Sequence, residues 1–404
     1  MRRTLQWGAV ALCALTVAGC GGGAGGGETT IAGTASTTTV SPPPIVGADR
    51  LDVGPYPRAP RPPLGTAGDA ATGAIAQAQQ LASFVIGPWE VDDSLTTPYL
   101  SSYYVINGPT PLQQLGPEGI ALAAGEHDLL YGFASAREAD DENGAMVNAV
   151  LRFPDTALAS AASAAMATAA VGQSIAGVTP TPTAVPGHPD AAASTYPFTP
   201  SGSGQPRATV RAFVPHGPYV FMQFVQSTDG VDAAAALVAK AFDAQGPLVD
   251  QFKAVDPSAL ASVPLDPTGL LAKTIPASPG EGAARNAVYQ TRGAQHFQSN
   301  PIASTKLFDD NGVSEVAMGQ TNVYKTKDAV TAKVVTESFN AEVNADGTTA
   351  APSVAALPDS HCLALSQQFY CVAPAAEYAI EVRSDALPDA QQQVSAQYAM
   401  LTAK

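Results

Sequence analysis

The fold is decided by a repeat that begins with Met146-Val-Asn-Ala-Val-Leu-Arg-Phe153. This β-rich stretch follows the turn sequence Asp140-Asp-Glu-Asn-Gly144. It precedes an alanine-rich segment, Asp155 to Ala170, whose first residue is a typical helix N-cap. The order predicts a turn, a strand and a helix.

The same order returns in the second half of the chain. Asp309-Asp-Asn-Gly312 precedes a predicted strand from Val316 to Tyr324, and Asp328 opens a predicted helix through about Val343. Further on, Val214 to Gln245 aligns without gaps on Val372 to about Met400. These matches indicate an internal duplication.

The end of each repeat is a strand followed by a helix. The alignment places Val220-Phe-Met-Gln-Phe224 on Tyr378-Ala-Ile-Glu-Val382. Helices are predicted from Val231 to Gln245, stopping at Gly246-Pro247, and from Asp389 to Leu401. We therefore expect an α+β fold of two related domains, each a mainly antiparallel sheet with helices on one face.

The domain limits follow from composition. We expect a signal peptide at 1–19, a Gly/Thr/Pro tether at 20–48, an N-terminal domain at 49–255, a proline-rich connector at 256–282 and a C-terminal domain at 283–404. A helix from Asp69 to Val85 opens the first domain, because apolar residues recur there at helical spacing. The prolines of the connector predict an extended segment rather than a helix.

The first twenty residues indicate export. Arg2 and Arg3 precede an apolar stretch that is too short to span a bilayer, as in a signal peptide. The stretch ends in Val17-Ala-Gly-Cys20, which is typical of a bacterial lipobox. We expect cleavage before Cys20, acylation of its thiol and anchoring on the extracytoplasmic face of the cell membrane, without a spanning helix.

The chain resembles an uncharacterised family of actinobacterial, mycobacterial-type cell-envelope lipoproteins. The resemblance rests on the lipobox, the tether and three blocks: Arg50-Leu-Asp-Val-Gly-Pro-Tyr-Pro57, Tyr131-Gly-Phe-Ala-Ser-Ala-Arg137 and Pro264-Leu-Asp-Pro-Thr-Gly-Leu-Leu271. It implies an envelope location and a duplicated two-domain body of unknown function. It implies no catalytic residue.

Two cysteines remain in the exported body. Cys13 leaves with the signal and Cys20 is acylated, whereas Cys362 and Cys371 flank two short strands around Ser366-Gln-Gln368. In an oxidising compartment this arrangement predicts a disulfide across a hairpin. A catalytic thiol pair is the alternative, although the spacing is not C-x-x-C.

Charge excludes one class of partner. The chain has 35 acidic and 20 basic residues, a net charge of −15, and loss of Arg2 and Arg3 would make it −17. Such a surface repels phosphates, so we expect no nucleic-acid partner. The tether would hold this acidic body near the membrane.

Motifs for enzymatic chemistry are missing. There is no G-x-S-x-G, no S-x-x-K and no phosphate-binding glycine loop, and Ser201-Gly-Ser-Gly204 lacks the strand-to-helix context of a nucleophile. No histidines are spaced as metal ligands. His188 and His361 occupy nearby positions in the two halves, as a symmetric site or as ordinary polar loop residues. The two acidic turns favour turn chemistry over calcium binding.

We therefore expect no enzyme, no cofactor and no metal site, but a binding module for a small apolar ligand or an envelope protein. Domain junctions are common pocket sites. Candidate lining residues, chosen by residue type, are Trp89, Tyr99, Tyr103, Tyr104, Tyr131, His188 and Arg211. Two alternatives stay open: a cell-wall or lipid hydrolase with an unrecognised acid/base pair, and a structural scaffold without a pocket.

Overall fold

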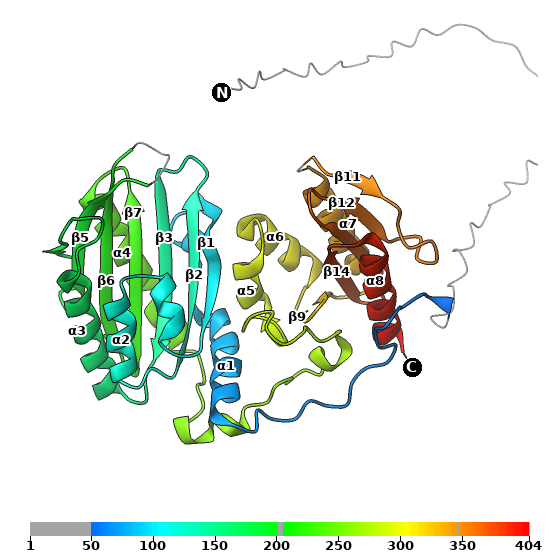
Figure 1. Cartoon of the computed structure of the whole chain (residues 1–404), viewed down its shortest axis with the longest axis horizontal. Coiled ribbons are helices and arrows are strands. Elements are labelled where there is room, and N and C mark those ends of the chain that lie inside the picture. The colour runs from blue at the N-terminus through cyan, green and yellow to red at the C-terminus, as the bar shows by residue number, and fades with distance from the viewer. Residues whose placement is uncertain (1–49, 201–204, 346, 404) are drawn as a thin grey trace, which may run out of the picture. The chain divides into compact units, whose positions relative to one another are not determined.

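Two seven-stranded antiparallel sheets form the body of the chain (Figure 1). The computed structural model describes residues 50–200, 205–345 and 347–403. The predicted signal, the tether, Cys20 and the Ser201–Gly204 stretch lie outside the described residues. Within the described ranges, no helix has both the length and the apolar character needed to cross a membrane.

The first sheet has the strand order β1-β2-β3-β7-β6-β5-β4. Its strands are β1 Leu95–Ile106, β2 Tyr131–Ala139, β3 Gly144–Arg152, β4 Thr181–Thr183, β5 Ala192–Phe198, β6 Arg207–His216 and β7 Tyr219–Ser227. The helices of this half are α1 Ala70–Leu81, α2 Glu118–Glu126, α3 Thr156–Gly172 and α4 Val231–Val249, with 3-10 helices η2 Ala82–Phe84, η3 Pro88–Glu90 and η4 Thr110–Gln114.

The second sheet has the order β11-β12-β13-β14-β10-β9-β8. Its strands are β8 Ala287–Gln290, β9 Glu315–Met318, β10 Asn322–Lys325, β11 Thr349–Ala351, β12 His361–Ala364, β13 Phe369–Ala375 and β14 Tyr378–Ser384. The helices are α5 Thr291–Ala294, α6 Pro301–Asn311, α7 Ala329–Ala345 and α8 Leu387–Thr402, with η5 Pro257–Ser262, η6 Leu271–Lys273 and η7 Gln295–Phe297.

The two sheets correspond strand for strand, which confirms the duplication. Reading the second sheet from β8 to β11 reproduces the order of the first sheet from β1 to β4, with β14 in the place of β7. Helix α7 follows β10 as α3 follows β3, and α8 follows β14 as α4 follows β7. Asp155 and Asp328 both accept a hydrogen bond from a backbone N–H three residues on, as predicted for helix starts.

The predicted alignment of the last hairpins is wrong by one residue. The β6–β7 hairpin closes with the pair His216 and Tyr219, and the β13–β14 hairpin closes with Ala375 and Tyr378. Tyr378 therefore corresponds to Tyr219 and not to Val220. Because side chains alternate along a strand, a shift of one residue exchanges the two faces of the sheet.

The predicted strand from Val316 to Tyr324 is in fact the hairpin of β9 and β10. The acidic stretch Asp309–Gly312 is also different, because it ends helix α6 with Gly312 in the left-handed conformation. The counterpart of the Asp140–Gly144 turn is therefore the β9–β10 turn. Helix α4 likewise runs past Gly246 with Pro247 inside it, whereas the sequence predicted a stop.

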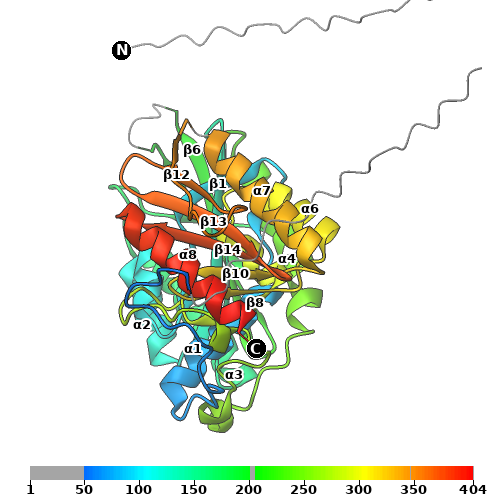
Figure 2. The ribbon, with the colours of Figure 1, turned by 90° about the vertical axis from the view of Figure 1, so that its right-hand side faces the viewer.

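Helices lie on both faces of each sheet, where one covered face was predicted. In the first domain α3 packs with Val147 and Ala149 on one face, while α4 packs with Met146 and Val150 on the other. In the second domain α7 and α8 divide the faces in the same way (Figure 2). The central strands β2, β3 and β7 of the first sheet are accordingly buried along nearly their whole length.

An N-terminal strap, residues 50–64, packs on the second domain although it precedes the first. Leu51 and Val53 are buried in the same core as Ile380 and Val394. The Tyr56 hydroxyl donates to Asp389 Oδ1 at 2.7 Å. The predicted connector is not a free linker, because η5 packs on α1 of the first domain and Leu270 and Leu271 join the same core as the strap.

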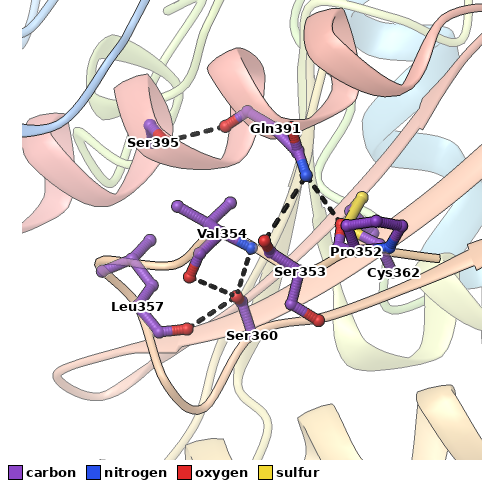
Figure 3. The surroundings of a disulfide bond; sticks show 9 residues. Pro352, Ser353, Val354, Leu357, Ser360, Cys362, Gln391 and Ser395 are labelled. Atoms are coloured by element: carbon purple, nitrogen blue, oxygen red, sulfur yellow. Dashed lines mark hydrogen bonds between the residues drawn. A yellow bond between two sulfur atoms is a disulfide. The ribbon is translucent and has the colours of Figure 1, made fainter.

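The predicted disulfide joins Cys362 of β12 to Cys371 of β13, which face each other in the sheet. Both cysteines are buried on the side of the sheet that α8 covers (Figure 3). Beside them, Gln391 of α8 donates to the carbonyls of Pro352 and Ser353, in the segment before β12. The bridge therefore reinforces the short β12–β13 hairpin, while the terminal helix holds the segment that leads into it.

Candidate functional site

A cavity of about 480 Å³ lies between edge strand β1 of the first sheet and the α7-side face of the second sheet. This volume falls within the ~300–1,000 Å³ usual for small-molecule sites. Its floor is built from β9, β10, β13 and β14, and its walls from β1, η7 and α7. The lining includes three arginines (Arg137, Arg285, Arg383) and three glutamates (Glu281, Glu342, Glu381). None of these six charges belongs to an ion pair within the described part of the chain.

A hydrogen-bonded chain crosses the floor. Arg285 donates to Asn322 Oδ1 at 2.8 Å, and the Asn322 amide donates to Glu381 Oε2 at 2.9 Å. The Tyr324 hydroxyl donates to the same oxygen at 2.7 Å. Burial and the nearby carboxylate raise the pKa of Tyr324 well above its usual value, so this hydroxyl stays protonated as a donor. Glu381 is thus held in one orientation.

Arg383 occupies the next position on the same face of β14. Its guanidinium lies 5.1 Å from the ring centre of Tyr370, its cross-strand partner on β13. The side chain of Arg383 is exposed, whereas Tyr370 is buried. A guanidinium over an aromatic face is attracted by the ring quadrupole, so the stacking directs Arg383 toward β13.

The opposite wall is an irregular part of β1. Pro98 pairs with Arg137 and Tyr103 pairs with Ser135, so three extra residues of β1 bulge out of the ladder. Leu100 and Ser102, within this bulge, both have a positive φ in the left-handed region, which is unfavourable for residues other than glycine. The bulge directs Ser102 and Tyr103 toward the cavity.

Arg137 ties the two domains together at the base of this wall. The side chain is 1% exposed and donates to the carbonyls of His296 at 2.9 Å and Gln298 at 2.8 Å. Desolvation lowers the pKa of its guanidinium to about 10, which still leaves it charged at neutral pH. Phe297, between these carbonyls, packs edge-on against Tyr103 at 4.4 Å. These contacts of Arg137 and Phe297 form a seam between the two domains, and this seam positions both walls of the cavity.

In the first domain, the surface that corresponds to the cavity floor is covered by helices. With Tyr219 matched to Tyr378, the cavity residues Asn322, Glu381 and Arg383 correspond to Ala149, Met222 and Phe224. These three counterparts are buried in a core with α2 and α3. At these three positions the same face of the sheet is therefore apolar and buried in the first domain, whereas it carries polar side chains that line a cavity in the second.

One of the aromatic residues predicted as lining, Tyr103, reaches this cavity. Trp89 lines a different cavity of about 760 Å³ with Ile302 and Lys306. Its ring lies 5.3 Å from that of His296 and 5.7 Å from the Arg137 guanidinium. Trp89 therefore borders the seam and not the polar cavity.

The other predicted lining residues are spread over the first domain. Tyr99, Tyr104 and Arg211 belong to the α3-side core, where the Arg211 guanidinium donates to the Leu115 carbonyl and lies over a phenyl ring. Tyr131 is buried on the opposite face, and burial raises its hydroxyl pKa. The structure does not bring the seven predicted residues into one site.

The two histidines of the predicted symmetric pair lie in separate domains, each bonded to a helix carboxylate. His188 Nε2 is 3.1 Å from Asp243 of α4, and His361 Nε2 is 3.0 Å from Glu337 of α7. No group of three or more possible metal-ligating side chains occurs among the described residues. These positions are ordinary surface contacts.

A serine–histidine contact is present but enclosed. Ser135 Oγ lies 2.9 Å from His296 Nδ1, while Nε2 of the same ring lies 3.0 Å from the Ala82 carbonyl. Ser135 and His296 are both 0% exposed, and desolvation lowers the imidazole pKa to about 3. A ring without solvent access and with so low a pKa is a poor general base. The contact holds the domain seam.

The comparisons establish the family. A domain of unknown function, DUF7373, matches in its N-terminal form at residues 64–265 and in its C-terminal form at residues 270–404. The chain therefore belongs to the DUF7373 family. No curated protein matches it. The extracellular domain of PknH from Mycobacterium tuberculosis is similar at 14% identity and a TM-score of 0.29, over 42% of this chain and 95% of that one.

Sequence reasoning missed most of the cavity lining. Asn322, Tyr324, Glu381 and Arg383 carry no motif, and they come from strands whose pairing the sequence did not reveal. One signal was available. After the one-residue correction of the alignment, three apolar residues of the first repeat stand opposite three polar residues of the second, which indicates that one face has changed its role.

Proposed function

We propose that this chain is a non-enzymatic binding module of the cell envelope that holds a small polar ligand in the cavity between its two domains. The observation that supports this proposal is the contrast between the two repeats. Burying Ala149, Met222 and Phe224 stabilises the first domain, whereas the second keeps charged and amide groups at the same positions. A solvent-open polar surface stabilises the fold less than a buried apolar one does. We therefore infer that the second domain retains its polar surface to bind a ligand.

The polar lining changes the expected ligand. The sequence favours an apolar molecule because its candidate lining residues are mostly aromatic. At the cavity, Glu381, Arg383 and the amides of Gln320 and Gln368 offer directional hydrogen bonds instead. We therefore propose a polar solute, with a protein partner as the alternative occupant of the same surface.

The location is proposed from the N-terminal sequence. A diacylglycerol on Cys20 would hold the acidic body at the outer face of the membrane. Metabolic labelling with a clickable palmitate analogue tests this part. Label should appear on the wild-type chain and be lost in Cys20→Ala, and label that persists in the variant would contradict the assignment.

Two neighbouring glutamines allow a controlled test of the ligand site. Gln368 lines the cavity, whereas Gln367, in the same exposed turn between β12 and β13, does not. Gln368→Trp should fill the entrance, and Gln367→Trp adds the same bulk outside it. Native mass spectrometry of each variant purified from its own envelope should show a small molecule bound to wild type and to Gln367→Trp, and absent from Gln368→Trp. Equal retention by both variants would refute the site, and a bare wild-type chain would refute the proposal.

A further inference from the structure

We infer that the ligand of this cavity is a zwitterion of amino-acid or short-peptide size, bound through its ammonium group at Glu381 and its carboxylate at Arg383. This inference rests on the proposed function and names the ligand class. It starts from two opposite charges that stand two residues apart on one face of β14 and do not pair with each other.

The neighbouring strands hold the two charges apart. Glu381 is drawn toward β10, where Asn322 and Tyr324 both donate to its Oε2 atom. Its other carboxylate oxygen has no hydrogen-bond partner among the described residues. Arg383 is drawn to the opposite side, over Tyr370 of β13. Since β14 lies between β10 and β13, the two groups are held toward opposite sides of the strand, and both line the cavity.

Among the described arginines, Arg383 shares the lack of a protein acceptor with Arg50 alone, and Arg50 does not line the cavity. Each of the other described arginines from Arg58 to Arg292 donates to a carbonyl, amide or carboxylate oxygen of the protein. Arg383 has no such acceptor within the described residues. A guanidinium that is oriented by stacking and free to donate suits a carboxylate, because its fork can form two parallel hydrogen bonds.

A ligand with a single charge would pair with only one of the two side chains, Glu381 or Arg383. A phosphate or a simple carboxylate would pair with Arg383 but meet the negative charge of Glu381. A neutral sugar could hydrogen-bond to both groups, yet it would leave both charges uncompensated in a partly enclosed space. An ammonium and a carboxylate on one molecule satisfy both groups, and the cavity volume limits that molecule to a small one.

The test uses capped forms of one probe. The full chain is screened by native mass spectrometry against the twenty amino acids and the twenty L-alanyl-X dipeptides, with glucose and inorganic phosphate as rival probes. The best binder is then measured by calorimetry in free, N-acetylated and C-amidated forms. Each cap should weaken binding ~10–100-fold, as expected for loss of a charge-assisted hydrogen bond.

Two substitutions assign each end of the probe. In Glu381→Gln, N-acetylation should no longer matter while amidation still does, and Arg383→Met should show the reverse. Glu377→Gln, at the far end of the same hairpin and outside the cavity lining, should behave as wild type. Thermal melts confirm that the variants are folded.

Several results would overturn the zwitterion. These are retention of glucose or phosphate without any amino acid or dipeptide, failure of every probe, or cap effects that persist unchanged in both variants. A co-purified neutral or anionic molecule that Gln368→Trp expels would leave the proposed binding function standing while refuting this ligand class.

Discussion

Acid should weaken this protein through one buried histidine at the seam between its domains. His296 is 0% exposed and lies between the rings of Trp89 and Phe133. Both ring nitrogens are already used: Nε2–H donates to the Ala82 carbonyl, and Nδ1 accepts from the Ser135 hydroxyl. Protonation would bury a charge beside Arg137 and Arg292, so burial and these cations lower the imidazole pKa to about 3.

The magnitude follows from linkage between proton binding and folding. In the unfolded chain His296 has a pKa near ~6.5, so below that pH the unfolded state binds a proton that the folded state rejects. Its contribution is present in full above pH 6.5 and is lost as the pH falls toward 3. Between pH 7 and pH 5 the expected loss of unfolding free energy is about 2 kcal/mol, a large share of the ~5–15 kcal/mol of an ordinary domain.

Urea denaturation of wild type and His296→Gln at pH 7 and pH 5 measures this loss. The variant is less stable at both values, but its drop between them should be smaller than the wild-type drop by about 2 kcal/mol. Other titrating groups are common to both chains and cancel in the difference. Chemical shifts of the His296 ring in the wild-type protein provide a second readout that does not depend on the variant folding.

Two results would refute the reasoning. One is an equal loss of stability on acidification in wild type and variant. The other is a His296 ring that titrates near its ordinary pKa in the folded protein, which would mean that the seam is open to water.

Three further outcomes concern single contacts. Arg137→Met should cost ~3 kcal/mol or more in urea unfolding because it orphans buried carbonyls. Arg383→Met, at an exposed side chain, should leave the unfolding free energy nearly unchanged. Similar losses in the two variants would contradict the stabilising role of Arg137 at the seam. Gly319→Ala should cost ~1–3 kcal/mol or more, because an added Cβ would lie 2.1 Å from a backbone carbonyl oxygen; an unchanged midpoint would contradict that packing. Cys362 and Cys371 should resist alkylation until reduced, and replacing both by serine should cost ~2–3 kcal/mol.

Local signals predicted much of the fold. Asp69, Asp155 and Asp328 start helices as expected, because an N-cap is encoded within a few residues. The hairpin between Cys362 and Cys371 was also predictable from adjacent residues. Helix α4 was extended past Pro247 by packing of Val249 in the core, which local propensity does not contain.

Pairing between distant strands was harder to predict. A gapless alignment can be off by one residue without losing its hydrophobic matches when both faces of a strand are buried, as in β7. The error then places Tyr378 on the wrong face. The cavity lining depends on that assignment, because the position of Glu381 follows from the face of Tyr378. The class of fold was therefore predictable from sequence, while the site was not.

The strap at residues 50–64 also bears on how the two repeats can be inherited. A plain tandem copy yields units that can be cut apart and moved, but here Leu51 and Val53 complete the core of the second repeat from a position upstream of the first. Either half moved alone would leave part of that core behind. The family matches begin at residues 64 and 270, so neither includes the body of the strap. Because the strap completes the second repeat from a position before the first, neither repeat can be inherited as a complete domain without the other.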